Sequence, residues 1–216
     1  TGVHKSTVFR TVKTLEANAY LERVPDSNKY KLGQHIIMLA TAKIDTLELQ
    51  IEARPFLLRL QAKTNCSIHL SVLEKTDVSY LFIIDDYSAT RTSTRNPKKN
   101  PAYCSSGGKC LLSALSGDTV NKLFANYEFK RFTDKTICSL EELKEELAQI
   151  RKQGYAVNRG EMEAQVGSIA FPVFGYSGEM IAAISVGTHL DRMDEKTLET
   201  IKHYTKDFAN QLSANM

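Results

Sequence analysis

The chain has 216 residues, 42% of them hydrophobic and 25% charged, a composition typical of a folded globular protein rather than a disordered one. Its apolar runs are short, and it has neither a membrane span nor a signal-peptide pattern, so we expect a cytoplasmic protein with no membrane partner. The four cysteines form no CxxC pair and have no histidine at zinc-like spacing. We therefore expect reduced thiols, no metal and no cofactor.

Charge is unevenly distributed, although the net charge is only +3. Residues 1–34 hold six basic residues against three acidic ones, whereas the remaining 182 residues hold 22 of each. A basic end on a neutral body is expected where only that end meets a polyanion such as nucleic acid. The chain starts at Thr1, without an initiator Met, and we expect further sequence upstream.

The first predicted element is an amphipathic helix over residues 6–20. Its apolar stripe consists of Val8, Val12, Leu15 and Ala19, which recur at helical spacing. The opposite face is basic and rich in hydroxyls: Lys5, Ser6, Thr7, Arg10 and Lys13. Such a face suits a helix whose first turn enters a major groove, where Arg and Lys contact guanine edges or phosphates.

A hairpin is predicted next, with strands at residues 21–24 and 29–32. The residues between them, Pro25 to Asn28, are all turn formers. A helix followed by a basic hairpin fits a recognition helix and its wing. It fits equally well a surface helix and hairpin with a solvated basic face.

This segment resembles the helix-turn-helix of the IclR family of transcriptional regulators, from the turn through the wing. The resemblance rests on GVHKSTVFR (residues 2–10), Leu15-Glu16, YLER (20–23) and KYKLG (29–33). It implies contacts to operator DNA by Lys5, Ser6, Thr7 and Arg10, and phosphate contacts by Lys29 and Lys31. The two preceding helices of the family are absent, so we expect an incomplete winged helix-turn-helix, and DNA binding by this chain stays open.

Residues 34–64 are rich in helix formers with dense apolar faces, and Pro55 is expected to start or kink a second helix. Such helices pack against a partner chain or against their own domain. The resemblance implies that the first helix joins the DNA-binding and sensor domains and contributes to a homodimer or tetramer. We therefore expect a partial winged helix-turn-helix at residues 1–33, a linker helix at 34–48 and an effector-binding domain at 49–216.

Beyond residue 65, short strands alternate with helices. Strands are expected at residues 67–73, 79–85, 91–95, 168–174 and 180–187, and helices near 108–115, 140–153 and the C-terminus. Ser139 with Glu142 predicts a capping box, Gly154 a helix end, and residues 176–179 a hairpin turn. With the resemblance, this predicts the α+β class and a GAF-like sensor domain, with a central antiparallel sheet flanked by helices.

The segment from Tyr103 to Lys109 (YCSSGGK) is the strongest candidate site. Its small residues open a helix whose first free amide groups bind carboxylate or phosphate. An N-cap followed by glycines needed only for a tight turn explains the same residues. The spacing does not match a Walker loop.

The resemblance extends to this part of the chain. The runs CSSGGKCLLSAL, GYAVNRGE, IAFPVF and AISVG resemble the effector-binding domain of the family. The resemblance implies that a small organic acid lies among Ser106, Gly107, Asn158, Ser168 and Ser185. Family members often have Asp, Cys and a second Ser in place of Asn158, Ser168 and Gly187, so their ligand need not be shared. Residues 127–137 resemble members that govern sugar-acid and pectin-breakdown genes, which points toward a keto sugar acid.

The sequence offers no catalytic constellation. Its five histidines have no partner at catalytic spacing, and GxSxG, HExxH and paired-carboxylate motifs are absent. Glu161 and Glu163 flank the expected pocket and are interpreted as solvated or structural. We therefore predict no enzyme but a DNA-binding repressor or activator controlled by a small acid. The alternative is a stand-alone sensor or dimerisation domain without DNA binding.

Overall fold

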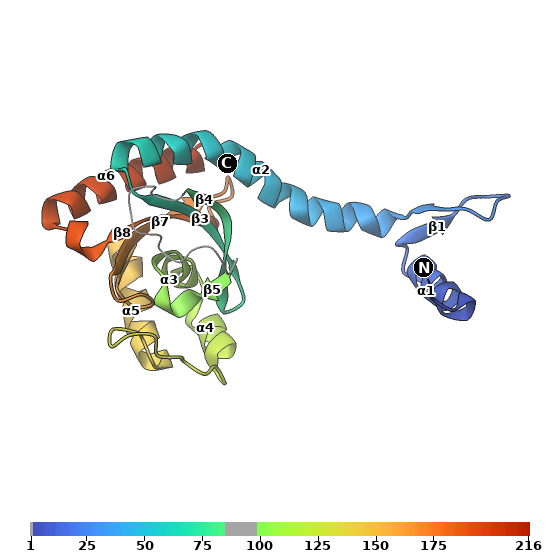
Figure 1. Ribbon diagram of the computed structural model, residues 1–216, viewed down its shortest axis with the longest axis horizontal. Helices are drawn as coiled ribbons and strands as arrows, with labels where there is room; N and C mark the ends of the chain where they lie inside the picture. The colour runs from blue at the N-terminus through green and yellow to red at the C-terminus, as the bar shows by residue number, and fades with distance from the viewer. Residues whose placement is uncertain (1, 85–98) are drawn as a thin grey trace. The chain divides into compact units, whose positions relative to one another are not determined.

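The computed structural model describes residues 2–84 and 99–216, apart from the side chains of residues 39–47. The chain divides into an N-terminal unit, Thr1–Leu49, and a C-terminal unit, Gln50–Met216 (Figure 1). The strand expected at residues 91–95 lies outside the described residues. Among the described helices, none is long and apolar enough to cross a membrane.

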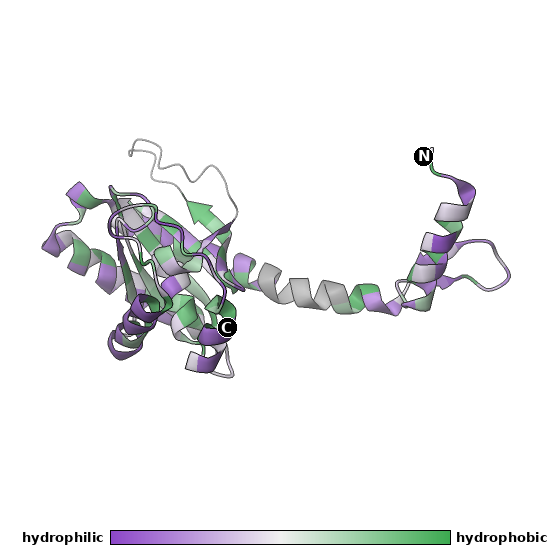
Figure 2. Ribbon diagram, turned by 90° about the horizontal axis from the view of Figure 1, so that it is seen from below, coloured by the Kyte–Doolittle hydropathy of each residue, from purple (hydrophilic) through white to green (hydrophobic). Residues whose placement is uncertain are grey.

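The N-terminal unit contains the predicted helix and hairpin, α1 (Lys5–Ala17), β1 (Leu21–Arg23) and β2 (Tyr30–Leu32). The ring of His4 caps α1 by accepting a hydrogen bond from the backbone N–H of Ser6. Within α1 no side chain is buried, and Val8 and Leu15 of the apolar stripe are 44% and 36% exposed. The helix beside the N label carries both hydrophilic and hydrophobic residues (Figure 2). The described residues therefore leave part of the apolar stripe exposed.

A single helix, α2 (Gln34–Thr64), follows, with Pro55 inside it. Pro55 therefore does not start a second helix, although it cannot donate the backbone hydrogen bond of that turn. Ala53, Leu57 and Leu60 are fully buried on either side of the proline. Their packing stabilises the helix across the missing bond.

The C-terminal unit is built on a six-stranded antiparallel sheet, which confirms the expected central antiparallel sheet. The strand order is β5-β4-β3-β8-β7-β6. The strands are β3 (Ser67–Glu74), β4 (Asp77–Ile84), β5 (Lys99–Pro101), β6 (Ala156–Arg159), β7 (Val166–Phe174) and β8 (Met180–His189). The sequence did not predict β5, because three residues are too few to show an alternating pattern.

Helices cover both faces of this sheet. They are α3 (Ser106–Ser113), α4 (Gly117–Phe124), α5 (Leu140–Gln153) and α6 (Glu195–Ser213), with short 3₁₀ turns η1 (Ala102–Cys104) and η2 (Leu190–Arg192). One face carries α6, which packs on β7 and β8, and the last turns of α2 lie beside it, with Arg59 over the ring of Phe208. The opposite face carries α3, packed on β3, β7 and β8 (Figure 1).

The ends of α5 agree with the predicted caps, with one difference. Ser139 Oγ accepts a hydrogen bond from the N–H of Glu142, as expected, and Gly154 ends the helix with φ of 80°. The Glu142 carboxylate accepts from the N–H of Cys138 rather than from that of Ser139, so the second bond of the capping box forms one residue earlier.

Helix α4 was not predicted, although its start has a clear signal. Ser116 is the N-cap and accepts a hydrogen bond from the N–H of Thr119. Val120 and Phe124 form the buried stripe that follows.

The two faces of the central strands differ in side-chain size. On the face toward α6, the fully buried residues Ile68, Ile184 and Val186 fill the core. On the α3 face, the corresponding positions of β3 and β8 include Ser71 and Ser185. These small side chains leave room beneath α3.

Candidate ligand-binding pocket

Cross-strand pairing gathers polar and small residues on the α3 face. One row runs across the sheet through Gly187 on β8, Ser168 on β7 and Asn158 on β6. The neighbouring row pairs His69 on β3 with Ser185 on β8. Directly paired residues of an antiparallel sheet share a face, so these side chains lie together.

The amino-terminal end of α3 lies over these rows. Ser105 is the N-cap, and its hydroxyl accepts a hydrogen bond from the N–H of Gly108 at 3.1 Å. The amide groups of Ser106 and Gly107 occupy the first turn, where a helix supplies no backbone acceptor. The helix dipole adds a positive electrostatic potential at this end.

Close packing explains both glycines. A Cβ on Gly108 would lie 2.3 Å from the carbonyl oxygen of Ala102, and one on Gly107 would lie 2.6 Å from the hydroxyl of Ser71. Neither glycine has a positive φ. The N-cap that the sequence suggested is present, but the glycines serve close approach rather than a tight turn.

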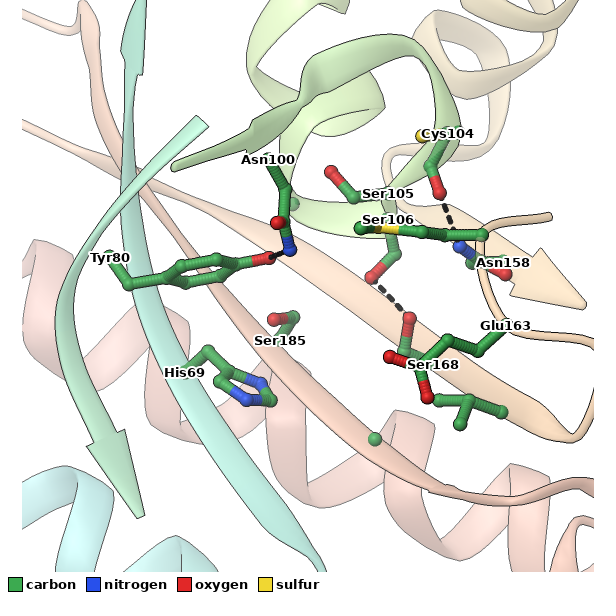
Figure 3. Close-up of a pocket in the computed structure, with 14 residues that line it drawn as sticks. His69, Tyr80, Asn100, Cys104, Ser105, Ser106, Asn158, Glu163, Ser168 and Ser185 are labelled. Carbon is green, nitrogen blue, oxygen red and sulfur yellow. Dashed lines mark hydrogen bonds between the residues drawn. The ribbon is translucent and has the colours of Figure 1, made fainter. Parts of the chain in front are cut away.

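A pocket of about 90 Å³ lies between the end of α3 and the sheet. All five residues predicted to bind an effector line it: Ser106, Gly107, Asn158, Ser168 and Ser185 (Figure 3). Residues far apart in the sequence, from α3, β6, β7 and β8, are thus brought to one cavity.

The predicted residues differ in their hydrogen bonds. The hydroxyls of Ser106 and Ser168 bond to each other at 2.7 Å. The hydroxyl of Ser185 makes no hydrogen bond to any residue of the described ranges, although the side chain is only 5% exposed. Ser185 is therefore the serine whose hydroxyl is most available to a ligand.

Asn158 has a structural task. Its amide donates to the carbonyl oxygen of Cys104 at 2.7 Å, and its Oδ1 accepts from the N–H groups of Gly160 and Glu161 at 2.9 and 3.0 Å. These bonds tie the loop after β6 to the turn before α3. Asn158 therefore shapes the pocket wall, and its oxygen is already occupied.

Sequence reasoning missed one side of the pocket, formed by His69, Tyr80 and Asn100. These residues come from β3, β4 and β5, and no motif connects them. A weak signal was the alternation of Ser67, His69 and Ser71 with aliphatic residues, which marks a polar face of that strand.

The ionisable side chains that line the pocket within the described ranges are His69, Tyr80, Cys104 and Glu163, with no Lys or Arg among them. Burial raises the pKa of the Cys104 thiol to about 12 and also raises the pKa of Tyr80. Both groups are thus held protonated at neutral pH, the form in which a thiol is a poor nucleophile. An anion here would be held by hydroxyl and amide donors and by the end of α3.

A buried ion cluster supports α3 from behind. Lys109 is 1% exposed, and its Nζ donates to Glu161 at 2.6 Å, to Glu146 at 2.7 Å and to the carbonyl oxygen of Val157 at 2.8 Å. Burial raises the pKa of Glu161. Glu161 is thus structural, whereas Glu163 is exposed and lines the pocket.

The residues predicted to contact DNA lie in the N-terminal unit. Lys5, Ser6, Thr7 and Arg10 occupy the first turns of α1 and are all exposed. On the hairpin, Lys29 and Lys31 are also exposed, and Lys31 forms an ion pair with Glu22 at 3.0 Å.

Comparisons with known proteins agree on one family. The model described as "Bacterial transcriptional regulator IclR C-terminal" matches residues 41–214. The chain is 32% identical over 212 residues to the HTH-type transcriptional regulator KdgR of Escherichia coli, covering 98% of this chain and 81% of the relative.

Two solved structures share the fold. The C-terminal domain of E. coli KdgR superposes with a TM-score of 0.70 at 32% identity, over 78% of this chain and 98% of that domain. An IclR homolog from Microbacterium hydrocarbonoxydans, complexed with 4-hydroxybenzoate, superposes with a TM-score of 0.70 at 27% identity, over 98% and 87% of the two chains. The predicted α+β fold with a GAF-like C-terminal domain is confirmed, and the chain belongs to the IclR family of bacterial transcriptional regulators.

Proposed function

We propose that the protein is a cytoplasmic DNA-binding regulator, not an enzyme, whose affinity for operator DNA is set by a small organic acid in the C-terminal pocket. The observation that carries this proposal is the convergence of Ser106, Gly107, Ser168 and Ser185 on one cavity at the open end of α3. Backbone amides in the first turn of a helix, together with the available hydroxyl of Ser185, suit a carboxylate. The relative complexed with 4-hydroxybenzoate is an IclR homolog that binds an organic acid.

On the DNA side, α1 is the recognition helix and the β1-β2 hairpin is the wing. Lys5, Ser6, Thr7 and Arg10 contact bases or phosphates, and Lys29 and Lys31 contact phosphates. A homodimer or tetramer would place two such helices on palindromic half-sites. An acid that binds one arrangement of the subunits more tightly shifts the population toward it, and operator affinity follows.

The sensing step is tested by a thermal-shift screen of small keto, hydroxy and sugar acids, including keto sugar acids. A ligand that binds only the folded state stabilises it and so raises the melting temperature. At a ligand concentration about a hundredfold above Kd, the stabilisation is about 2.7 kcal/mol. The shift should be lost in Ser185→Val, which replaces the available hydroxyl with a methyl group and adds a second methyl group to the pocket. It should persist in Ser177→Val, a change on the exposed β7-β8 turn.

Two outcomes would count against the proposal. If no acid raises the melting temperature, acid sensing is wrong. If an acid raises it equally in the wild type and in Ser185→Val, the acid binds somewhere other than this pocket.

A further inference from the structure

The pocket has a second polar side, opposite Ser106 and Ser168, that no predicted residue accounts for. Tyr80 and Asn100 lie together on β4 and β5, and the ring of His69 packs against Tyr80 with centroids 5.3 Å apart. In Figure 3 these three side chains stand to one side of the cavity, and Ser106, Ser168 and Asn158 to the other. We call His69, Tyr80 and Asn100 the β-side wall.

One polar atom of the β-side wall has no hydrogen-bond partner among the described residues. The Asn100 amide donates to the Tyr80 hydroxyl oxygen at 3.1 Å. Asn100 Oδ1 is buried and accepts no hydrogen bond from any residue in the ranges 2–84 and 99–216. An unsatisfied buried acceptor costs folding free energy, so its presence beside a cavity points to a donor supplied from inside that cavity.

Tyr80 supplies the complementary group. Its oxygen already accepts from Asn100, so its proton is left to donate. Burial raises the pKa of Tyr80 and keeps that proton in place at neutral pH. The wall therefore presents one acceptor and one donor, side by side.

A hydroxyl group is the ligand group that satisfies both atoms, because it donates one hydrogen bond and accepts others. A keto oxygen only accepts, and a methylene group does neither. A carboxylate would place its negative charge against Asn100 Oδ1, whereas the end of α3 across the pocket offers it free amides. The two sides of the pocket thus differ in the group that they receive.

We propose that the β-side wall recognises a hydroxyl of the effector while the end of α3 receives its carboxylate, so that the effector is a hydroxylated carboxylic acid of the sugar-acid class. This inference rests on the proposed acid-sensing function and makes it more specific. Tyr80 and Asn100 become the residues that separate hydroxylated acids from simple aliphatic or keto acids.

The test compares matched acids by isothermal titration at one pH and ionic strength. The pairs are D-gluconate with hexanoate and D-glycerate with propionate, which share chain length and carboxylate and differ in hydroxyls. In the wild type, the hydroxylated member of at least one pair should bind about tenfold or more tightly than its partner, because a site built to bond a hydroxyl rejects analogues without one.

Two variants assign that preference to the wall. Tyr80→Phe removes the donor, and Asn100→Leu removes the acceptor while keeping a side chain of similar size. Each should reduce the preference for the hydroxylated acid to about threefold or less while changing the affinity for the plain acid less than about twofold. Tyr176→Phe, on a side chain that is 94% exposed, is the matched control and should keep the full preference. Unchanged melting temperatures without ligand establish that the variants fold.

The outcomes separate the two claims. If both members of every pair bind equally in the wild type, or if the preference survives in Tyr80→Phe and Asn100→Leu, the β-side wall has been assigned wrongly, while acid sensing stands. If none of the four acids binds, the hydroxylated-acid proposal falls as well, and the wider thermal-shift screen decides acid sensing separately.

Discussion

Replacing Lys109 with Met should be among the most damaging single changes in the C-terminal unit. Met keeps most of the length of the side chain but removes the ammonium group that lies 2.6 and 2.7 Å from two carboxylates. The Glu161 side chain is only 10% exposed, so its charge would lose its main partner in a largely dry environment. Removing one partner of a buried ion pair typically costs about 3–5 kcal/mol. For a protein of this size, that corresponds to a drop in melting temperature of about 6–20 °C.

The loss should also depend on pH, with a sign set by Glu161. Its pKa in the folded state is raised, mainly by burial, and Lys109 opposes that rise. A raised carboxyl pKa means that the stability contributed by Glu161 is complete below its unfolded pKa and is lost as the pH rises through the folded pKa. Without Lys109 that pKa rises further, so Lys109→Met should be more destabilised at pH 8 than at pH 5.

Urea denaturation followed by circular dichroism at both pH values measures this effect. Lys144→Met, at an exposed position of α5, is the matched control and should change stability by less than about 0.5 kcal/mol. The double variant Lys109→Met with Glu161→Gln should recover part of the loss at pH 8, because it removes the uncompensated charge. A stability of Lys109→Met within about 1 kcal/mol of the wild type at pH 8 would refute this account of the cluster.

Two further changes test other parts of the chain. Gly108→Ala should destabilise the protein by about 1–3 kcal/mol in the same denaturation assay, because its Cβ would lie 2.3 Å from the carbonyl oxygen of Ala102. An unchanged stability would show that α3 packs less closely on Ala102 than described. Arg10→Ala should leave the melting temperature unchanged but weaken DNA binding, measured by fluorescence anisotropy. The slope of log affinity against log salt concentration should become shallower by about one, because one fewer phosphate is neutralised. Unchanged DNA affinity would show that α1 does not contact DNA.

The patterns that predicted structure from sequence were local ones. Helical spacing and caps placed α5 at the residues observed, and its capping serine and terminal glycine behave as expected. Resemblance named five residues that the fold brings to one pocket. In contrast, the second helix expected to start at Pro55 does not form, because the burial of Leu57 and Leu60 outweighs a local signal for a helix start. A kink at Pro55, the other expectation, stays a prediction.

The remaining features depend on contacts between distant segments. Lys109 was seen only as part of a glycine-lysine motif, because its carboxylate partners lie 37 and 52 residues away. The β-side wall joins Tyr80 to Asn100, which sits in a strand of three residues. Neither the burial of Lys109 nor the unsatisfied oxygen of Asn100 leaves a trace in sequence periodicity.

The central claim is that occupancy of the C-terminal pocket controls DNA binding, and operator affinity with and without a stabilising acid tests it most directly. Operator fragments can be selected from genomic DNA with the protein itself and then titrated by fluorescence anisotropy at fixed salt. A saturating acid should change operator affinity by about fivefold or more in the wild type and leave it unchanged in Ser185→Val. An acid that binds in the pocket, while operator affinity stays the same, would contradict the claim and leave a sensor without control over DNA.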